Sequence, residues 1–383
     1  MKIARIDVFV LKTALDTPFA FSQMWIGQRS AVLVRISSDD GLVGWGEAFT
    51  QGPEPPEIAA TAIEYALKPW LIGRDPLDIN VLWHEMYIKT RDFGRKGSVV
   101  SAISGIDMAL WDLAGHHYQQ PIHRLLGGAF RHQIQPYATG FYRINGQGEA
   151  ARLAEEALQH REAGFRAMKI KLGFGLRDDI EVMHAINDAL ADPSIELMVD
   201  ANHAYGRSEA LTLGRELEQF NLRWFEEPVV PEDIEGYAEL RSRLSVPIAG
   251  GENEHTLFGF YPLIKAGGLD IAQPDIGSCG GITGARDIAA IAHAAGIAVN
   301  PHVWGSAVAQ AASVQFIACL PVAHARLFPQ QPILEYDRSS HPFRQQLIVD
   351  PLQMQDGMIT VNDKPGLGIE VRMDTVEQYT SQE

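Results

Sequence analysis

The sequence predicts an α/β protein in which a TIM-like barrel follows a smaller α+β domain. Three observations carry this prediction. The chain has 383 residues, which suits two domains or one barrel with an extra module. Residues 1 to about 125 mix alternating and helical apolar patterns, whereas later residues repeat a short apolar strand and an amphipathic helix, as βαβ units do. Hydrophobic residues make up 46%, which excludes a disordered chain.

The chain is expected to begin with antiparallel strands. Ile3–Val10 alternates apolar and polar residues, and Ala31–Ile36 and Leu42–Ala48 are β-prone runs separated by Asp39-Asp40-Gly41. Asp-Gly between two such runs predicts a hairpin. Apolar periodicity then predicts three helices, over Glu57–Ile72, Leu77–Ile88 and Ser98–His117.

Eight short apolar strands are expected in the barrel, with segments between them long enough for crossover helices. An open, doubly wound sheet is the structural alternative. Ionisable residues at many strand ends favour the closed barrel, because barrel active sites lie at the carboxyl ends of the strands. The predicted strands are Ile134–Ala138, Ala167–Lys171, Glu196–Asp200, Arg223–Glu226, Val246–Gly250, Asp270–Gln273, Ala298–Asn300 and Ile333–Tyr336. The predicted helices include 149–163, 178–190, 208–220, 235–244 and 282–295.

These patterns divide the chain into three parts. Residues 1–125 are expected to form the α+β domain and residues 126–349 the barrel. Residues 350–383 form a C-terminal segment in which Gly357–Val361 resembles another strand. We expect this segment to return to the first domain.

The charge balance is strongly acidic. Lys and Arg number 32 against 48 Asp and Glu, giving a net charge of −16, which disfavours a nucleic-acid partner. No apolar run approaches the roughly 20 residues of a membrane span, and Met1–Asp7 is charged where a signal peptide would be apolar. We therefore expect a cytoplasmic protein with no membrane partner. Cys279 and Cys319 are too few for a disulfide framework, and we expect reduced packing residues.

Three acidic residues at strand ends indicate a metal site. Asp200, Glu226 and Glu252 each follow a predicted strand, and successive members are 26 residues apart, one β/α unit each. Because the carboxyl ends of barrel strands face one mouth, we expect these carboxylates to reach one cation. An all-oxygen ligand set favours Mg²⁺ over Zn²⁺. Helix capping is the alternative role for any one of them, and Glu227 is the alternative ligand on the fourth strand.

Two more pairs of ionisable residues belong to the same mouth. Lys169 and Lys171 project to one side of their strand, and each lowers the pKa of the other by like-charge repulsion, so that one can act as a base. A structural pair that bridges to the acidic residues is the alternative. Asp275 and His302 are 27 residues apart on the sixth and seventh units, where the carboxylate is expected to orient the imidazole.

This set of residues resembles the mandelate racemase subgroup of the enolase superfamily. Members carry a Lys-x-Lys pair, three acidic Mg²⁺ ligands and an Asp-His dyad on successive strands, and the resemblance covers nearly the whole chain. It implies a modified (β/α)₇β barrel with an N-terminal α+β capping domain that the C-terminal tail completes. It also implies a homo-oligomer, Mg²⁺ at the three carboxylates, and Lys171 and His302 as opposed acid/base residues.

Several segments resemble a narrower group, the galactarolactone and anhydro-sugar-acid cycloisomerases. Two stretches depart from that group: Asn253-Glu254-His255 stands where Thr-Trp-His is expected, and a loop over Phe21–Arg29 differs from an arginine-bearing version. Both are expected to touch the substrate. The resembling segments are Asp16-Thr17-Pro18-Phe19, 224–232, Gln273-Pro274-Asp275, 301–305, 342–345 and 365–370.

The resemblance implies a reaction on a small anionic sugar acid. We expect Mg²⁺-dependent abstraction of the proton α to the carboxylate, an enediolate, and β-elimination that opens an aldarolactone or anhydro-sugar acid to a 3-deoxy-2-keto acid. Lys171 is expected to be the base, with Lys169 beside the substrate carboxylate or on the metal side. Glu335, on the eighth strand, either donates a hydrogen bond to that carboxylate, if its pKa is raised, or forms a rim salt bridge. Residues expected to contact the substrate are Met24, Trp25, Asn202 and Trp304.

Three alternative functions stay open at this point. An open-chain sugar-acid dehydratase uses the same two steps and releases water. A racemase or epimerase uses both acid/base residues with no leaving group. A sugar-acid-binding protein without activity would keep the fold and lose the chemistry, because a fold alone does not fix a function.

Overall fold

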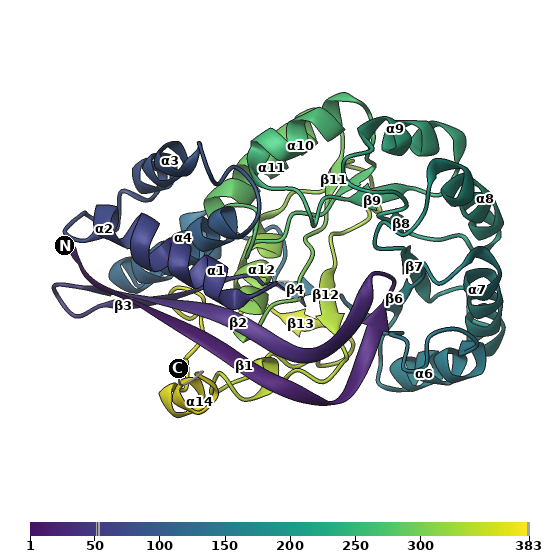
Figure 1. Ribbon diagram of the computed structural model, residues 1–383, viewed down its shortest axis with the longest axis horizontal. Coiled ribbons are helices and arrows are strands. Elements are labelled where there is room, and N and C mark those ends of the chain that lie inside the picture. The colour runs from purple at the N-terminus through teal and green to yellow at the C-terminus, as the bar shows by residue number, and fades with distance from the viewer. Residues whose placement is uncertain (51, 53, 381–383) are drawn as a thin grey trace.

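Two sheets, one antiparallel and one parallel, organise the structure (Figure 1). The computed structural model describes residues 1–50, 52 and 54–380. The antiparallel sheet contains β1 (Ile3–Phe21), β2 (Met24–Ser38) and β3 (Val43–Ala48) in that order. The predicted hairpin at Asp39-Asp40-Gly41 is confirmed as the connection between β2 and β3.

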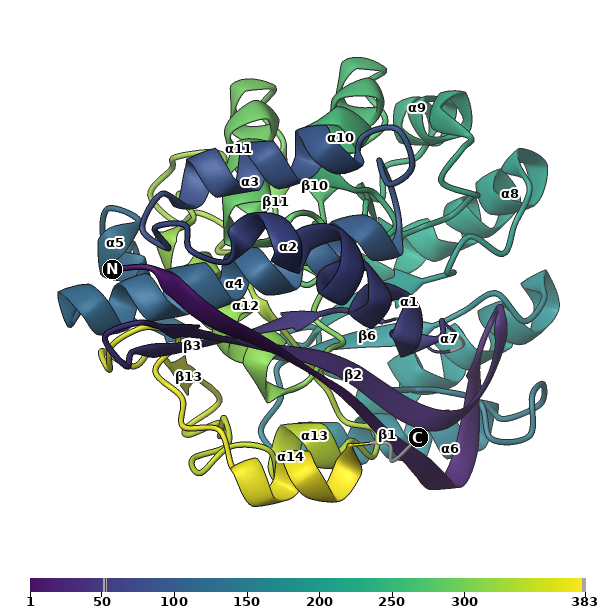
Figure 2. The ribbon, with the colours of Figure 1, turned by 60° about the vertical axis from the view of Figure 1, so that its left-hand side comes forward.

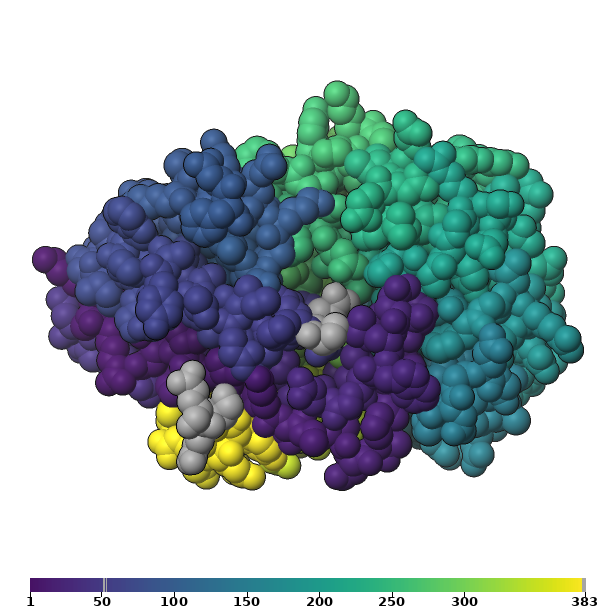
Figure 3. Space-filling view, viewed as in Figure 1, coloured from purple at the N-terminus to yellow at the C-terminus, as the bar shows by residue number. Residues whose placement is uncertain are grey.

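The first hairpin is much longer than the sequence predicted. Ile3–Val10 is only the first part of β1, and the predicted loop over Phe21–Arg29 is wrong, because Met24 already begins β2. A shift in register between Ala14 and Phe19 interrupts the alternation and hides the continuation of the strand. The tip of this hairpin crosses to the barrel, where the Ser22 hydroxyl donates to the Ala201 carbonyl at 2.8 Å. Figure 3 shows this purple tip against the teal part of the barrel.

Helices cover one face of the antiparallel sheet and complete the capping domain. They are α1 (Pro56–Thr61), a π-helical turn η1 (Ala62–Leu67), α2 (Lys68–Leu71), α3 (Ile79–Thr90), α4 (Ser98–Tyr118) and the short α5 (Ile122–Leu125). The predicted helices are confirmed, with the first divided by the π-helical turn. Helix α4 is buried from Val100 to Gly115 and packs closely on β3, because Gly44 and Gly46 leave no side chain between them.

Eight parallel strands form the second sheet, in the order β11-β10-β9-β8-β7-β6-β5-β12. Their bounds are β5 (Pro136–Thr139), β6 (Ala167–Lys171), β7 (Glu196–Asp200), β8 (Phe225–Glu226), β9 (Ile248–Gly250), β10 (Ile271–Ala272), β11 (Ala298–Val299) and β12 (Leu334–Asp337). The seven helices between them are α6 (Ala150–Glu162), α7 (Leu176–Leu190), α8 (Arg207–Leu217), α9 (Ile234–Arg243), α10 (Thr256–Lys265), α11 (Gly281–Ala294) and α12 (Ala307–Cys319), with a 3₁₀ turn η2 (Glu218–Phe220) after α8. This arrangement is the expected (β/α)₇β barrel.

Side chains bridge the two outer strands of the curled sheet. Asn300 Oδ1 accepts a hydrogen bond from the backbone N–H of Ile333 at 2.8 Å, and Glu335 Oε2 accepts one from Val303 at 2.9 Å. Pro301 has no N–H to donate to a strand ladder at this point of the chain. The side chains of Asn300 and Glu335 therefore connect β11 with β12.

The C-terminal segment contacts both parts of the molecule. The predicted strand over Gly357–Val361 contracts to β13 (Ile359–Thr360), which pairs with β4 (Gln133–Ile134) rather than with the capping sheet. β4 is the first part of the strand predicted over Ile134–Ala138, which is thus divided in two. After α13 (Pro342–Gln345), helix α14 (Met373–Tyr379) packs on β1 and completes the capping domain.

Buried carboxylates of the capping domain hold the N-termini of two barrel helices. Asp107 on α4 accepts hydrogen bonds from the Thr283 backbone N–H at 2.9 Å and hydroxyl at 2.6 Å, at the start of α11. Glu47 on β3 accepts from the backbone N–H groups of Ser306 and Ala309, at the start of α12. These hydrogen bonds satisfy backbone N–H groups in the first turns of the two helices and thereby connect the two domains. Figure 2 shows α4 lying across these helices.

No helix in the described part of the chain is long and apolar enough to span a membrane.

The Asp107 contact makes the stability of the domain junction depend on pH. Burial raises the pKa of Asp107 from 3.8 to about 7, although the hydrogen bonds from Thr283 oppose the shift. The native state therefore holds this proton more tightly than the unfolded chain, and the associated stability is lost as the pH rises from about 4 towards 7. Asp107→Asn has no charge to bury, so its free energy of unfolding should increase relative to the wild type over this range. Urea unfolding at about pH 5 and about pH 8 measures the difference; an equal difference at both would contradict the prediction.

Candidate active site

The register of the parallel strands brings the predicted metal ligands together. Lys171 pairs with Asp200 across β6 and β7, and Asp200 pairs with Glu226 across β7 and β8. Glu252 follows β9 after Gly251, whose φ of +116° turns the chain into the mouth. One carboxylate oxygen from each of Asp200, Glu226 and Glu252 lies within 4.8 Å of the others.

These three carboxylates fit a hard divalent cation. All three are buried, they offer only oxygen ligands, and Glu252 Oε2 has no hydrogen-bond partner among the described residues. Burial, opposed by Lys169 and reinforced by Asp200 and Glu252, raises the pKa of Glu226 to about 8. This cluster is thus short of positive charge, as expected of a site that takes up a cation.

The alternative ligand Glu227 lies outside this carboxylate cluster. Its backbone has a φ of +43°, and its Oε1 accepts a hydrogen bond from Asn253 Nδ2 at 2.8 Å. Glu226 Oε2 instead accepts from Trp224 Nε1 at 2.8 Å and from Gln273 Nε2 at 2.7 Å. These two donors orient Glu226 towards the other carboxylates.

The two lysines both contact carboxylates in the barrel. Lys169 Nζ lies 2.6 Å from Glu226 Oε1 and 2.9 Å from Glu335 Oε1, while Lys171 Nζ lies 2.6 Å from Asp200 Oδ2. The expectation of a lowered pKa for Lys171 is wrong in this structure. Burial and Lys169 do lower it, but Asp200 and the other acids raise the pKa above its ordinary value.

His302 and Asp275 form the expected pair. His302 Nδ1 lies 2.7 Å from Asp275 Oδ2, and a parallel β-bridge between the two residues extends strands β10 and β11. His302 Nε2 faces the metal-ligand cluster, 3.5 Å from Glu252 Oε2. Burial lowers the pKa of His302, but Glu252, Glu335 and Asp275 outweigh burial and raise it to about 10.

Glu335 accepts hydrogen bonds in the barrel and does not donate. Its Oε1 accepts from Thr139 Oγ1 at 2.7 Å and faces Lys169, while its Oε2 accepts from Val303. Burial raises the pKa of Glu335, but Lys169, His302 and Lys171 outweigh it and bring the pKa below the ordinary value. The expectation that Glu335 is protonated and donates a hydrogen bond is therefore wrong. The alternative, a salt bridge, is present, but it is a buried ion pair with Lys169 rather than one at the rim.

A small cavity lies between these groups and the capping domain. Lys171 and His302 face it from the second and seventh strands of the barrel, and Trp304 Nε1 donates to Tyr142 Oη at 2.8 Å on its wall. The Arg29 guanidinium lies 4.3 Å from the Trp304 ring centroid and pairs with Asp337 at 3.0 Å. The lining residues are Phe21, Tyr142, Lys171, Asn202, Glu252, His302 and Trp304.

The structure brings only part of the predicted substrate contacts to this cavity. Asn202 and Trp304 line it, and Asn202 Oδ1 also accepts a hydrogen bond from Lys171 Nζ at 3.0 Å. Met24 packs on the apolar cluster behind the wall. Trp25 does not line the cavity: it is 55% exposed, because neighbouring residues of β2 face opposite sides.

Sequence reasoning missed Phe21 and Tyr142 as cavity residues. Phe21 is the last residue of β1, in a stretch interpreted as a loop, and Tyr142 follows β5 without any charged neighbour pattern. The residue before Tyr142, Phe141, has a positive φ, which turns the backbone at this point. A non-glycine residue with this conformation cannot be recognised from the sequence. Asn253 and Glu254 were expected to touch substrate, but they contact Glu227 and Lys96 and do not line this cavity.

The arrangement suits proton transfer next to a carboxylate. An amine and an imidazole face one enclosed space, beside oxygen ligands that could hold a cation. A cation supported by fixed lysines stabilises charge that develops on a substrate carboxylate, which is the main obstacle to removing the α-proton.

Comparison with known families gives two matches along the chain. Residues 5–127 match the mandelate racemase / muconate lactonizing enzyme N-terminal domain, and residues 152–375 match the enolase C-terminal domain-like family.

Known relatives include both cycloisomerases and dehydratases. D-galactarolactone cycloisomerase of Agrobacterium fabrum is 42% identical over 379 residues, 99% of each chain. The crystal structure of 3,6-anhydro-D-galactonate cycloisomerase from Zobellia galactanivorans superposes with a TM-score of 0.89 at 37% identity, covering 100% of both chains. A variant of L-talarate/galactarate dehydratase liganded with Mg and L-glucarate superposes with a TM-score of 0.87 at 29% identity, covering 100% of this chain and 92% of the other.

The carboxylate cluster predicts a clear difference between two adjacent glutamates. Glu226→Gln removes a charge from the cluster and should weaken Mg²⁺ binding by more than the roughly 10- to 100-fold that loss of a supporting residue costs. Glu227→Gln changes a carboxylate outside the cluster and should keep most of the affinity. Calorimetric titration with Mg²⁺, with circular dichroism as a folding control, measures both. Full Mg²⁺ affinity in Glu226→Gln would assign the ligand elsewhere.

Proposed function

The chain belongs to the mandelate racemase and muconate lactonizing enzyme family of the enolase superfamily, whose members are lyases and isomerases, and we propose that it is a Mg²⁺-dependent sugar-acid cycloisomerase. The observation that most supports this proposal is the pair of proton-transfer groups, Lys171 and His302, on opposite sides of one cavity. The cavity also borders Glu252, one of the three carboxylates. Its substrate is a small anionic sugar acid.

The three carboxylates Asp200, Glu226 and Glu252 would hold the Mg²⁺ ion. When bound, the ion supplies positive charge for the substrate carboxylate as negative charge develops there. Lys169 adds an ammonium group beside two of these carboxylates, at 2.6 Å from Glu226 and 3.5 Å from Asp200. Lys169 thereby offsets the repulsion between the acids and supports binding of a carboxylate substrate.

Lys171 is the proposed base. Its ammonium is fixed by Asp200 and Asn202, which aims Nζ from β6 at the cavity. The amine takes the proton on the carbon next to the substrate carboxylate as that C–H bond breaks. The base must lose its own proton first, and a cation held by Asp200 would favour this loss because it would offset the negative charge that stabilises the ammonium.

His302 is the proposed acid for the second step. The bond from the β-carbon to the ring oxygen breaks, and the imidazolium donates its Nε2 proton to the leaving oxygen. Asp275 fixes the ring through Nδ1, so that Nε2 is the nitrogen left for the substrate. The enol product then becomes a 3-deoxy-2-keto acid.

The cavity walls favour a lactone or anhydro ring over an extended acid. Phe21, Tyr142 and Trp304 are large, and the Tyr142–Trp304 hydrogen bond fixes two of them. Glu254 would oppose a second substrate carboxylate if it faced the cavity, but it pairs with Lys96 at 2.8 Å instead. A dehydratase acting on open-chain acids is the second candidate, since a liganded dehydratase shares this fold.

Proton exchange separates the roles of the two groups. Lys171→Ala should lower turnover by about 10²–10⁴-fold and also abolish exchange of the substrate α-proton with D₂O. His302→Asn should lower turnover to a similar extent while exchange continues, because the base remains. Lys265→Ala and His117→Asn, both exposed, are matched controls. Exchange that stops in His302→Asn and continues in Lys171→Ala would reverse the assignment.

Substrate form decides between the two activities. We expect kcat/KM for galactarolactones or anhydro-sugar acids to exceed that for the matched open-chain acids by about tenfold or more, equivalent to about 1.4 kcal/mol. Assays with Mg²⁺ that detect 2-keto products, run on matched pairs, measure this ratio. A tenfold preference for the open-chain acid would identify a dehydratase.

A further inference from the structure

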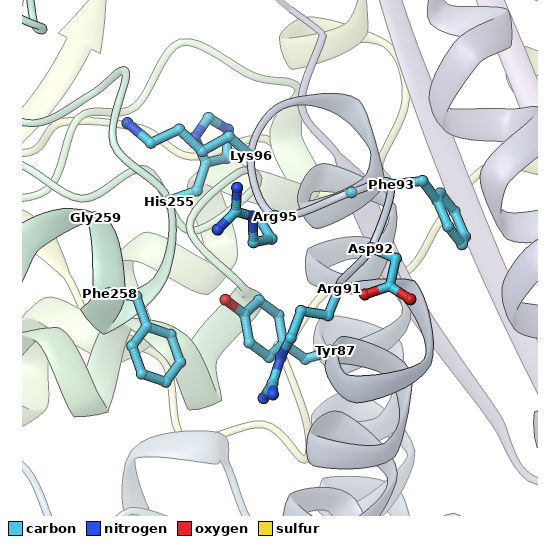
Figure 4. Close-up of a pocket in the computed structure, with 10 residues that line it drawn as sticks. Tyr87, Arg91, Asp92, Phe93, Arg95, Lys96, His255, Phe258 and Gly259 are labelled. Atoms are coloured by element: carbon cyan, nitrogen blue, oxygen red, sulfur yellow. The ribbon is translucent and has the colours of Figure 1, made fainter.

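A second cavity lies at the junction of the capping domain and the barrel. Its volume is about 840 Å³, within the range of small-molecule sites. Residues 91–96, which connect α3 to α4, form one side, and the start of α10 forms the other. Figure 4 shows the side chains of both elements around this space.

Positive charge is concentrated on one wall of this cavity. Arg91, Arg95 and Lys96 occur within six residues, against the single acid Asp92, in a protein whose net charge is −16. In the described part of the chain, neither Arg91 nor Arg95 has an ion pair or hydrogen bond to its guanidinium. Lys96 pairs with Glu254, so two unpaired guanidinium groups remain against Asp92.

Aromatic rings and a buried imidazole complete the lining: Tyr87 is on α3, on the same side as Arg91, whereas His255 and Phe258 are on the opposite side. The Tyr87 and Phe258 rings stack, with centroids 5.5 Å apart and planes at 12°. Arg91 lies 5.6 Å from the Tyr87 centroid, which fixes one cation over an aromatic face. His255 Nδ1 is buried without a hydrogen-bond partner in the described structure. Such a nitrogen is costly unless a ligand or water reaches it.

We propose that this junction cavity binds a small organic anion whose carboxylate or phosphate group contacts Arg91 and Arg95 and whose body lies against Tyr87 and Phe258. Guanidinium groups recognise both anions through paired N–H donors. The aromatic pair covers the less polar part of the ligand. Figure 4 shows Arg95 between Tyr87 and the Lys96–His255 side of the cavity.

The junction cavity is separate from the active-site cavity. None of the described residues lines both. Lys96 lines the junction cavity and holds Glu254, two residues after the metal-ligand candidate Glu252. An anion bound at the junction therefore competes with Glu254 for this ammonium.

Calorimetric titration with 2-oxoglutarate and with inorganic phosphate tests the proposal. The proteins compared are the full-length wild type, the double variant Arg91→Gln/Arg95→Gln, Lys171→Met as a change in the active site, and Arg215→Gln as an exposed control on α8. At least one probe should bind the wild type and both single variants equally, and about tenfold or more weakly to the double variant. Binding of 2-oxoglutarate alone identifies a carboxylate site, and binding of phosphate alone a phosphate site.

Two results would overturn the proposal. The first is the absence of binding by both probes to the wild type at millimolar concentration. The second is binding that the double variant keeps, or that Lys171→Met loses, because the anion would then occupy the active site. Both arginines are exposed, and their guanidinium groups form no hydrogen bond with the part of the chain that the structure describes, so their replacement is expected to leave the fold intact.

Discussion

The structure depends on the burial of several carboxylates inside one barrel. Asp200, Glu226, Glu252, Glu335 and Asp275 are all buried, and the cations that contact them in the described part of the chain are Lys169, Lys171 and His302. Buried charges of one sign are tolerated only with close counter-charges. Each cation therefore touches at least one carboxylate, and negative charge is still in excess. The excess of negative charge holds the two lysine ammonium groups in place. It also accounts for the divalent-cation binding that we propose.

The register of the parallel strands places these charged side chains next to one another. Contacts between the capping domain and the barrel then hold the strands and helices in place. Parallel pairing sets Lys171, Asp200 and Glu226 side by side, which no loop could do as accurately. Glu47 and Asp107 then fix the starts of α12 and α11, close to the loops that follow His302 and Asp275. The capping domain thus holds the helices that follow His302 and Asp275, while the tip of its first hairpin contacts the barrel at Ala201.

Much of this could be predicted from the sequence, for a physical reason. Strand-end residues in a barrel must converge, so the 26-residue spacing of Asp200, Glu226 and Glu252 was sufficient to place them together. Residues that act through tertiary contacts left no such pattern. Trp25 was a plausible wall until the side of β2 it faces was known, and the direction of the Lys171 and Glu335 pKa shifts depended on which charges lie nearest. Local spacing determines position, and long-range contacts determine charge state.

Asn253 and Glu254, which depart from the cycloisomerase pattern, do not line the active-site cavity. Asn253 and Glu254 follow a metal-ligand candidate directly, yet the chain turns at Gly251 so that both side chains leave the cavity. Their partners, Glu227 and Lys96, lie in the barrel wall and at the domain junction. Asn253 and Glu254 therefore fix the segment after β9 and do not line the active-site cavity. The large side chains of the cavity wall, Phe21, Tyr142 and Trp304, come from three separate parts of the chain and meet where the hairpin reaches the barrel.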